Sequence, residues 1–186
     1  HNILNSLAAV VLGLEMGLSF KIIAKGMHNY PGVRRRFDIK GIYDDILIVD
    51  DYAHHPTEVE ATLRSAKSGW DRRIVAVFQP HLFSRTKEFF KEFAEALQIA
   101  DIVIITDIYP AREQPVAGIT SKLIYDELSI TLKDHCHLLP DLDDLRDKLD
   151  DIAESGDIIL TMGAGNIWRY NESYVDHLQS MSQGVE

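Results

Sequence analysis

The stretch "VDDYAHHPTEVEATL", residues 49–63, predicts a β-strand that runs directly into an α-helix. An apolar run, "ILIVD", ends inside it, and apolar residues at helical spacing follow. The junction between them carries five polar or titratable side chains: Asp50, Asp51, Tyr52, His54 and His55. A strand that leads straight into a helix is the repeating element of βαβ units, so we expect this junction to belong to an α/β fold.

The rest of the chain repeats the pattern. Segment 36–52 predicts a β-hairpin around residues 43–45, whose second strand is "ILIVD". Further short apolar strands are predicted at 73–79, 101–107 and 157–163, with a weaker one in "HCHLLP", and helices at 57–68, 84–99, 120–129, 141–154 and 164–180. This alternation predicts a three-layer α/β domain in which helices cover both faces of a mostly parallel sheet.

The first thirty residues have a different character. Apolar positions at helical spacing predict one helix that ends near Gly17 and a second, short helix capped by Ser19. Pro31 and Gly32 then interrupt the pattern, and we place a domain boundary there. The N-terminus has no basic leader and carries Glu15 within its apolar part, so we do not interpret it as a signal peptide. The absence of a starting Met suggests a piece of a longer chain.

Composition restricts the classes of function. The 186 residues carry a formal charge of −10, which argues against nucleic acid as the main partner but leaves nucleotides and other small anions open. Cys136 is the only cysteine, so no intramolecular disulfide is possible, and a reducing, cytoplasmic location fits best. No apolar run approaches the roughly 20 residues that a membrane-spanning helix needs.

Polar residues collect directly after the predicted strands. These segments are "DDYAHHP", "QPHLFSR", "DIYPAREQPVAG" and "MGAGNIWR". Because parallel strands end at one edge of the sheet, and ligands of such sheets bind outside that edge, we expect these segments to form the binding site.

At the first junction, Asp50 or Asp51 could accept hydrogen bonds from a ribose diol. Thr57 is the expected N-cap of the next helix, with Pro56 in its first turn and Glu60 completing a capping box. We expect one of the two adjacent histidines to face a ligand and the other to be structural. A metal site at His54 and His55, or at His135 and His137, is the alternative.

The other segments offer cations and backbone donors. His81 and Arg85 flank a predicted helix start, and the arginine suits a carboxylate or phosphate. Considered without its neighbours, Arg85 would more simply be interpreted as a surface residue at a helix end. "RRRF" at 34–37 could present a cation to a phosphate. "MGAGN", residues 162–166, could bring backbone N–H groups near an anion or form a plain tight turn. The chain contains no GxxxxGK[ST] P-loop.

Six motifs taken in order, "HNILNSLAA", "RRRFD", "VDDYAHHPTE", "VFQPHLFSRT", "TDIYPAREQPVAG" and "TMGAGNI", resemble the Mur ligases over nearly the whole chain. The resemblance implies three domains in the complete protein: one for a UDP-sugar, a central ATPase with the P-loop, and a C-terminal Rossmann-like domain that brings in the amino acid. It implies that residues 1–30 are the last helices of the central domain and residues 31–186 the C-terminal domain.

The resemblance also implies roles for individual residues. ATP contacts would be Asn2 and Asn5 to adenine, Arg36 to the phosphates and Asp51 to the ribose hydroxyls. Substrate contacts would be Tyr52, His54, His81 and Arg85. It assigns neither a catalytic residue nor a metal ligand to this chain. One departure concerns Leu82, because some relatives carry a second basic residue there, which leaves the set of carboxylate contacts open.

The activity implied is ATP- and Mg²⁺-dependent joining of L-alanine to UDP-N-acetylmuramate through an acyl phosphate, a step of peptidoglycan biosynthesis. The partners implied are these substrates and the N-terminal and central domains of the same chain, with no nucleic acid and no membrane insertion. Without the P-loop domain, this chain alone is expected to be inactive. The alternatives are a murein tripeptide ligase of cell-wall recycling and a non-catalytic nucleotide-binding module.

Overall fold

A computed structural model describes residues 2–30 and 32–183, with side chains described for 5–30 and 32–182. The chain divides into two compact units, residues 1–33 and residues 34–186. The first unit consists of α1 (Asn2–Glu15) and α2 (Phe20–His28). Ser19 caps α2 by accepting a hydrogen bond from Ile22 N, as predicted. A Cβ on Gly13 would lie 2.8 Å from Ile23 Cδ1, so the absent side chain lets α1 and α2 pack closely.

The second unit is built on one six-stranded sheet of order β1-β2-β6-β3-β4-β5. Its strands are β1 (Asp38–Tyr43), β2 (Ile46–Asp51), β3 (Ile74–Phe78), β4 (Ile102–Thr106), β5 (Cys136–Leu139) and β6 (Ile158–Met162). Only β1 is antiparallel to its neighbour, and all other pairings are parallel. The β1–β2 turn places Asp44 and Asp45 at φ +48° and +62°, the backbone that a two-residue hairpin requires. The predicted hairpin and mostly parallel sheet are therefore confirmed.

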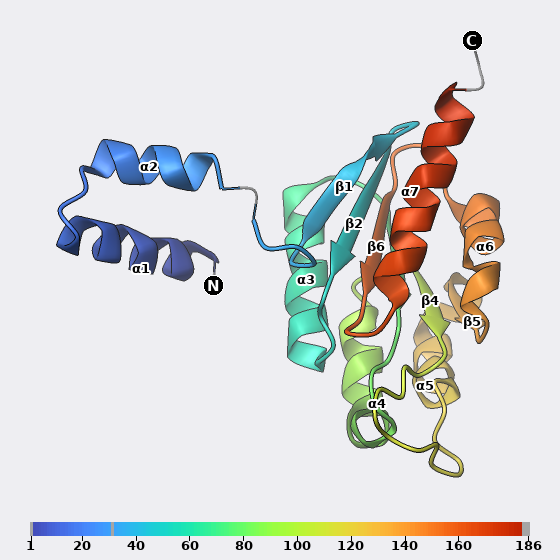
Figure 1. Cartoon of the computed structure of the whole chain (residues 1–186). Coiled ribbons are helices and arrows are strands. Elements are labelled where there is room, and N and C mark those ends of the chain that lie inside the picture. Colours follow the sequence, from blue (N-terminus) through green and yellow to red (C-terminus); the bar gives the residue numbers. More distant parts are fainter. Residues whose placement is uncertain (1, 31, 184–186) are drawn as a thin grey trace. The chain divides into compact units, whose positions relative to one another are not determined.

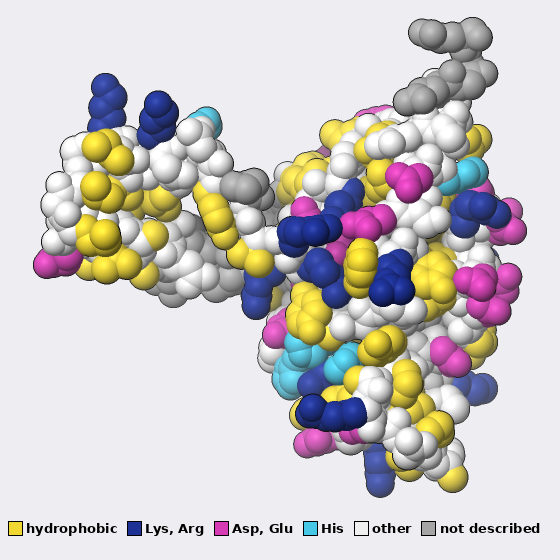
Figure 2. Space-filling model, in the orientation of Figure 1, with side chains coloured by type: hydrophobic (Ala, Val, Ile, Leu, Met, Phe, Trp, Pro, Cys, Tyr) yellow, Lys and Arg dark blue, Asp and Glu magenta, His cyan; other side chains and the backbone are white. Residues whose placement is uncertain are grey.

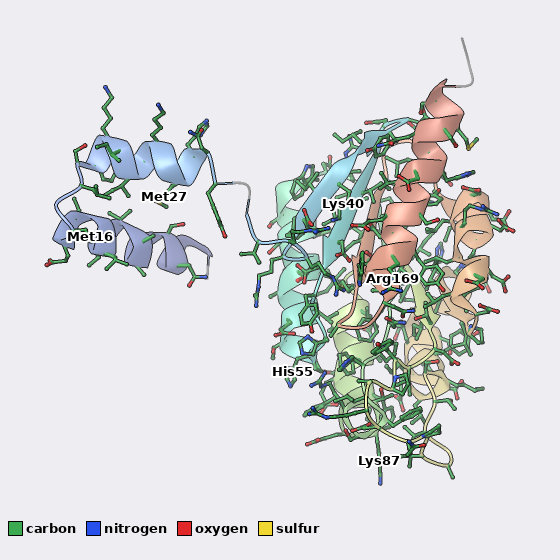
Figure 3. All side chains as sticks on the ribbon, in the orientation of Figure 1. Met16, Met27, Lys40, His55, Lys87 and Arg169 are labelled. Carbon is green, nitrogen blue, oxygen red and sulfur yellow. The ribbon has the colours of Figure 1, made fainter. Side chains whose placement is uncertain are left out.

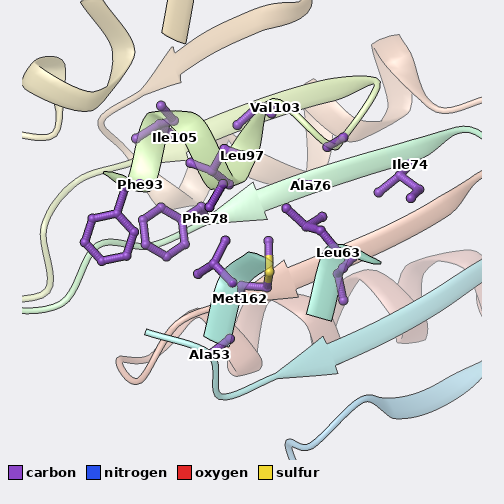
Figure 4. Close-up of a cluster of buried hydrophobic side chains, with 14 of the residues drawn as sticks. Ala53, Leu63, Ile74, Ala76, Phe78, Phe93, Leu97, Val103, Ile105 and Met162 are labelled. Carbon is purple, nitrogen blue, oxygen red and sulfur yellow. The ribbon is translucent and has the colours of Figure 1, made fainter. Parts of the chain in front are cut away.

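Helices cover both faces of the sheet (Figure 1). They are α3 (Pro56–Gly69), α4 (Phe83–Leu97), α5 (Lys122–Leu132), α6 (Leu145–Ile152) and α7 (Ile167–Gln183), with short 3-10 turns at Lys133–His135 and Leu142–Asp144. Alternate strand residues contribute to one core with α3, α4 and α5 and to a second core with α6 and α7. In the first core Phe78 packs on Phe93 with ring centroids 5.0 Å apart (Figure 4). The predicted three layers are confirmed.

The start of α3 differs from the prediction. The N-cap is His55 rather than Thr57, and Glu58 rather than Glu60 accepts the capping hydrogen bond from the backbone N–H of His55, at 3.1 Å. The reason is Pro56, which needs no amide partner and takes the first helical position, so the N-cap lies two residues earlier than predicted. Within the described residues, no helix is long and apolar enough to cross a membrane.

Candidate functional site

The segments that follow the strands meet at one edge of the sheet, as the topology predicts. His81, after β3, and Tyr109, after β4, form a parallel β-bridge, and Gly163, after β6, donates its N–H to Asp51 O at the end of β2. On the face shown in Figure 2, histidine side chains gather beside Lys and Arg side chains. Three consecutive loops and the end of β6 therefore share one site.

Asp51 is fixed by the backbone on both sides of it. Its carboxylate oxygens accept hydrogen bonds from Phe37 N at 2.6 Å and from Ala53 N at 2.7 Å. Burial raises the pKa of Asp51 above its ordinary value, and these two N–H groups oppose the shift. Each oxygen keeps a second lone pair, so the carboxylate can hold its own loop and still accept from a hydroxyl.

Asp50 forms a buried ion pair with Arg35. Arg35 Nε lies 3.1 Å from Asp50 Oδ2, its Nη2 donates to Gly163 O, and its guanidinium lies 4.8 Å from the ring centre of Tyr52. Asp50 Oδ1 accepts from Thr161 Oγ1 at 3.0 Å. Burial raises the pKa of Asp50, with Arg35 opposing the shift. One guanidinium thus ties together the ends of β2 and β6.

Arg34 and Arg36, the neighbours of Arg35, have different surroundings. Arg34 makes an exposed ion pair with Glu172 at 3.4 Å. Arg36 is exposed and, among the described residues, has no hydrogen-bond or ion-pair partner. Of the three consecutive arginines, Arg36 is therefore the one whose guanidinium donors are all unused among the described residues.

His54 lies between the β2 end and α4. Its Nδ1 is 2.8 Å from Tyr52 O and 3.3 Å from Glu58 Oε2, and 24% of its side chain is exposed. Its ring packs edge-on against Tyr52 at 5.2 Å and against His81 at 5.9 Å between centroids. It is thus held at Nδ1 and partly open to solvent.

His81 and Arg85 lie one helical turn apart at the start of α4. Arg85 Nη1 is 3.4 Å from His81 Nδ1 and 3.4 Å from His54 O. His81 stacks on Tyr109 with centroids 5.8 Å apart and planes within 14°. Burial first, and then the positive Arg85, lower the pKa of His81, so its neutral form is favoured.

Leu82, directly after His81, has the backbone angles φ +74° and ψ 135°, a region that residues with a side chain rarely adopt. Its N–H donates to Tyr109 O at 3.0 Å, and its carbonyl accepts from Thr86 N and Thr86 Oγ1. These bonds hold a strained turn that directs His81 into the cluster.

His55 has a structural role, unlike its neighbour. Its Nδ1 is 3.0 Å from Thr57 Oγ1, and its ring packs edge-on against Phe89 at 5.1 Å, beside α3 (Figure 3). The sequence expectation was that one of the two histidines would face the ligand. The geometry identifies His54 as the one that joins His81 and Arg85.

The loop after β6 is a tight turn fixed by Gln79. Gln79 Oε1 accepts from Ile167 N, at the start of α7, and its Nε2 donates to Asn166 Oδ1 at 2.8 Å. A Cβ on Gly165 would meet Gln79 Oε1 and lie 2.6 Å from Tyr109 Cγ. Because a side chain already occupies the first turn of α7, the plain-turn interpretation of "MGAGN" is favoured over an anion site.

Apart from Arg36, described above, the residues predicted from the sequence fall into three groups. Tyr52, His54, His81 and Arg85 come together at the strand ends, with Asp51 buried beside them. Asn5 is exposed on α1 in the other unit, whose placement relative to this one is not determined. The side chain of Asn2 lies outside the described residues.

Four residues of this edge were missed by sequence reasoning: Arg35, Glu58, Gln79 and Tyr109. Glu58 carried a usable signal, since Pro56 at the first helical position places it at the third. The other three depend on partners distant in the sequence, such as Gly163, which lies 128 residues after Arg35. In the described part of the chain no three His, Cys, Asp or Glu side chains come together as a metal site.

Comparison with known proteins adds a family. Residues 35–165 match the family described as "Mur ligase, glutamate ligase domain". The UDP-N-acetylmuramate–L-alanine ligase of Geotalea uraniireducens is 47% identical over 179 residues, which are 96% of this chain and 39% of that protein. The chain thus spans about two fifths of the length of the curated relatives that it matches.

Two solved structures have the same fold. The UDP-N-acetylmuramate–alanine ligase of Thermotoga maritima aligns with a TM-score of 0.80 and 31% identity, over 97% of this chain and 38% of that one. A murein peptide ligase of Psychrobacter arcticus aligns with a TM-score of 0.66 and 27% identity, over 96% of this chain and 37% of that one.

Proposed function

This chain belongs to the Mur ligase family, and on that premise we propose that it is the amino-acid-binding part of an ATP-dependent ligase that joins L-alanine to UDP-N-acetylmuramate. The product would be the first aminoacyl intermediate of peptidoglycan biosynthesis, made in the cytoplasm. The proposal is supported by 47% identity to a curated UDP-N-acetylmuramate–L-alanine ligase across 96% of the chain. The arrangement of the strand-end residues supports it independently.

We propose that the complete protein contains the UDP-sugar domain and the central ATPase domain, since this chain spans only 39% of the matched relative. Residues 1–30 would be the last helices of the central domain and 31–186 the C-terminal domain. The first unit has a feature that fits this assignment, because it leaves many large apolar side chains exposed. They are Leu7, Val11, Leu12, Leu14, Met16, Leu18, Phe20, Ile22, Tyr30 and Val33. A covering domain would remove such a surface from water.

The second unit offers groups that suit ATP, and it would recognise the ribose and the phosphates of the nucleotide. Asp51 keeps acceptor capacity for ribose hydroxyls, and Arg36 has its guanidinium donors free among the described residues. Asn2 and Asn5 would supply the adenine contacts from the first unit. Mg²⁺ neutralises phosphate charge when bound, and we assign its ligands to the central domain.

The substrate contacts would be Tyr52, His54, His81 and Arg85. Arg85 lies 3.4 Å from both His81 Nδ1 and His54 O, and its planar guanidinium suits a carboxylate better than a lysine would. His81, whose pKa is lowered by burial and by Arg85, would stay neutral beside that cation. Together they would hold alanine close to the activated lactyl carboxyl group, and that proximity lowers the barrier to attack.

The observation that carries this proposal is the position of Arg85 between His81 Nδ1 and the carbonyl of His54. The test compares Arg85→Lys in the complete polypeptide that carries this chain with the wild type, measuring phosphate release with UDP-N-acetylmuramate, ATP and varied L-alanine. We expect the KM for alanine to rise about tenfold or more, because a point charge replaces a planar fork, a difference of about 1.4 kcal/mol.

The matched control is Arg64→Lys, an exposed α3 residue paired with Glu60, which should leave the kinetics unchanged. An unchanged KM in Arg85→Lys would contradict the assigned role. Preference for a tripeptide over alanine would instead support the recycling ligase, and nucleotide binding without ligation would support a binding module. This chain alone, without a P-loop, is expected to form no product.

A further inference from the structure

Hydrogen-bond partners fix the tautomers of the two histidines in the site, and they fix them in opposite senses. A carbonyl oxygen only accepts, so the 2.8 Å contact of His54 Nδ1 with Tyr52 O requires a proton on that nitrogen. A guanidinium only donates, so the 3.4 Å contact of Arg85 Nη1 with His81 Nδ1 requires a lone pair there. In neutral His54 the lone pair is therefore on Nε2, and in neutral His81 the proton is on Nε2.

Resting on the proposed function, we propose that His54 Nε2 is the general base that takes the proton from the α-ammonium group of alanine, while His81 Nε2–H donates to the substrate. No described residue makes a hydrogen bond to His54 Nε2, and the side chain is 24% exposed, so that lone pair is open to a ligand. The two rings are 5.9 Å apart between centroids, close enough to contact one small amino acid together.

The chemistry requires such a base. An ammonium group has no lone pair, so alanine must lose one proton before its nitrogen can attack the acyl carbon. That N–H bond breaks as the Nε2–H bond of His54 forms. The amine lone pair then forms the C–N bond, the carbon–oxygen bond to phosphate breaks, and the second amine proton leaves with the phosphate. His54 finally releases its proton to water.

The carboxylates near the site are less available as bases. Burial alone would raise the pKa of Glu58, but N–H donation from His54 and His55 outweighs it and holds that pKa below its usual value. Ser84 lowers the pKa of Glu113 in the same way. Asp50 and Asp51 are buried and engaged by Arg35 and by backbone N–H groups.

Glu58 also explains how His54 would act. Its carboxylate lies 3.3 Å from His54 Nδ1 and accepts the backbone N–H of His54 at 3.0 Å. A negative charge at Nδ1 stabilises the imidazolium that forms when Nε2 takes a proton, and it holds the ring in the required tautomer. Glu58 is thus a positioning residue for His54. Arg85, beside the same ring, would bind the carboxylate end of alanine.

The test is His54→Asn in the complete polypeptide, because the asparagine amide keeps a donor near the position of Nδ1 and removes Nε2. Two nucleophiles are compared at neutral pH with UDP-N-acetylmuramate and ATP: L-alanine, which arrives protonated, and hydroxylamine, which arrives largely unprotonated and traps the acyl phosphate as a hydroxamate. We expect kcat with alanine to fall about 10²- to 10⁴-fold, a larger effect than that on the KM for alanine, while hydroxamate formation is kept.

A second variant, Glu58→Gln, keeps the acceptor for the two backbone N–H groups but removes the charge. It should lower kcat with alanine by a smaller factor and also spare hydroxamate formation. The control is His55→Asn, which replaces the neighbouring histidine by another good N-cap and should behave like wild type.

The outcomes separate the two proposals. If His54→Asn keeps its alanine turnover, or loses alanine and hydroxylamine reactions equally, His54 is not the base, although the proposed ligase activity stands. If the wild-type polypeptide forms no hydroxamate from UDP-N-acetylmuramate and ATP, the proposed function itself fails.

Discussion

Two halves of the same sheet edge differ in how their polar groups are satisfied. In the anchoring half, Arg35, Asp50 and Gln79 make hydrogen bonds of 3.1 Å or less to partners within the fold. In the open half, Arg85 reaches His54 and His81 only at 3.4 Å, and one nitrogen of each histidine has no partner among the described residues. The contrast indicates two different roles: one half fixes the loops, and the other keeps its donors and acceptors for ligands.

The anchoring half should therefore dominate stability, and Arg35→Gln should have the largest effect. It removes the charge that faces Asp50, a carboxylate with no exposed surface, and the donor to Gly163 O. Breaking a buried ion pair from one side costs about 3–5 kcal/mol, so we expect a loss of that order in the free energy of unfolding, measured by urea denaturation of this chain.

The control is the preceding arginine. Arg34→Gln removes an ion pair to Glu172 in which the arginine side chain is 82% exposed, and should cost less than about 1 kcal/mol. Equal losses in the two variants would show that the anchoring half is no more important for stability than the surface.

Gly165→Ala should have the next largest effect, because it inserts one methyl group between the two halves. That methyl would meet Gln79 Oε1 and lie 2.6 Å from Tyr109 Cγ. Overpacking of this kind costs about 1–3 kcal/mol. Displacement of Tyr109 would also move the stacked His81. Gly69→Ala, with nothing within 4 Å of its added Cβ, is the matched control. If Gly165→Ala leaves the free energy of unfolding unchanged, the neighbours of the added methyl group move aside without cost.

The sequence predicted the layers and the edge well, because both depend on local patterns. Apolar runs such as "RIVAVFQ" mark the buried parallel strands, and the polar residues after them follow from where strands end. The predicted N-cap of α3 was wrong by two residues, since Thr57 has the stronger capping propensity and the effect of Pro56 on the helix start was underestimated.

The division of the edge into two halves could not be predicted from the sequence. Arg34, Arg35 and Arg36 are chemically identical, and only the fold decides which of them lies beside Asp50. The role of Tyr109 could not be predicted either, because its stacking on His81 depends on how β3 and β4 align at their ends. Contacts between distant segments are set by tertiary structure, and no local pattern encodes them.

The open half should affect how the free energy of unfolding depends on pH. This effect should be smaller than those of Arg35→Gln and Gly165→Ala. The pKa of His81 is lowered in the folded state by burial first and then by Arg85 and His54. The unfolded chain therefore binds more protons, and the stability contributed by neutral His81 is present above its ordinary pKa and is lost as the pH falls toward the lowered value.

Urea denaturation of wild type and His81→Asn, repeated through this mildly acidic range, checks that sign. The variant, whose amide oxygen can still accept from Arg85, should lose less stability on acidification than the wild type. A steeper loss of stability in the variant on acidification would contradict a lowered pKa of His81 in the folded state. Because His137 also has a lowered pKa, only the difference between the two proteins reports on His81.

Arg36→Gln should have the smallest effect on stability and separates binding from folding most sharply. Arg36 is exposed and makes no hydrogen bond or ion pair among the described residues, so the free energy of unfolding should change by less than about 0.5 kcal/mol. In the complete polypeptide, the same change should raise the KM for ATP, because a cation proposed to face the phosphates is gone. Compared with Arg35→Gln, which should unfold the chain more readily, this variant should fold normally and bind nucleotide poorly. If Arg36→Gln instead lowered stability as much as Arg35→Gln, Arg36 would belong to the anchoring half, and the phosphate contact would have to come from another cation.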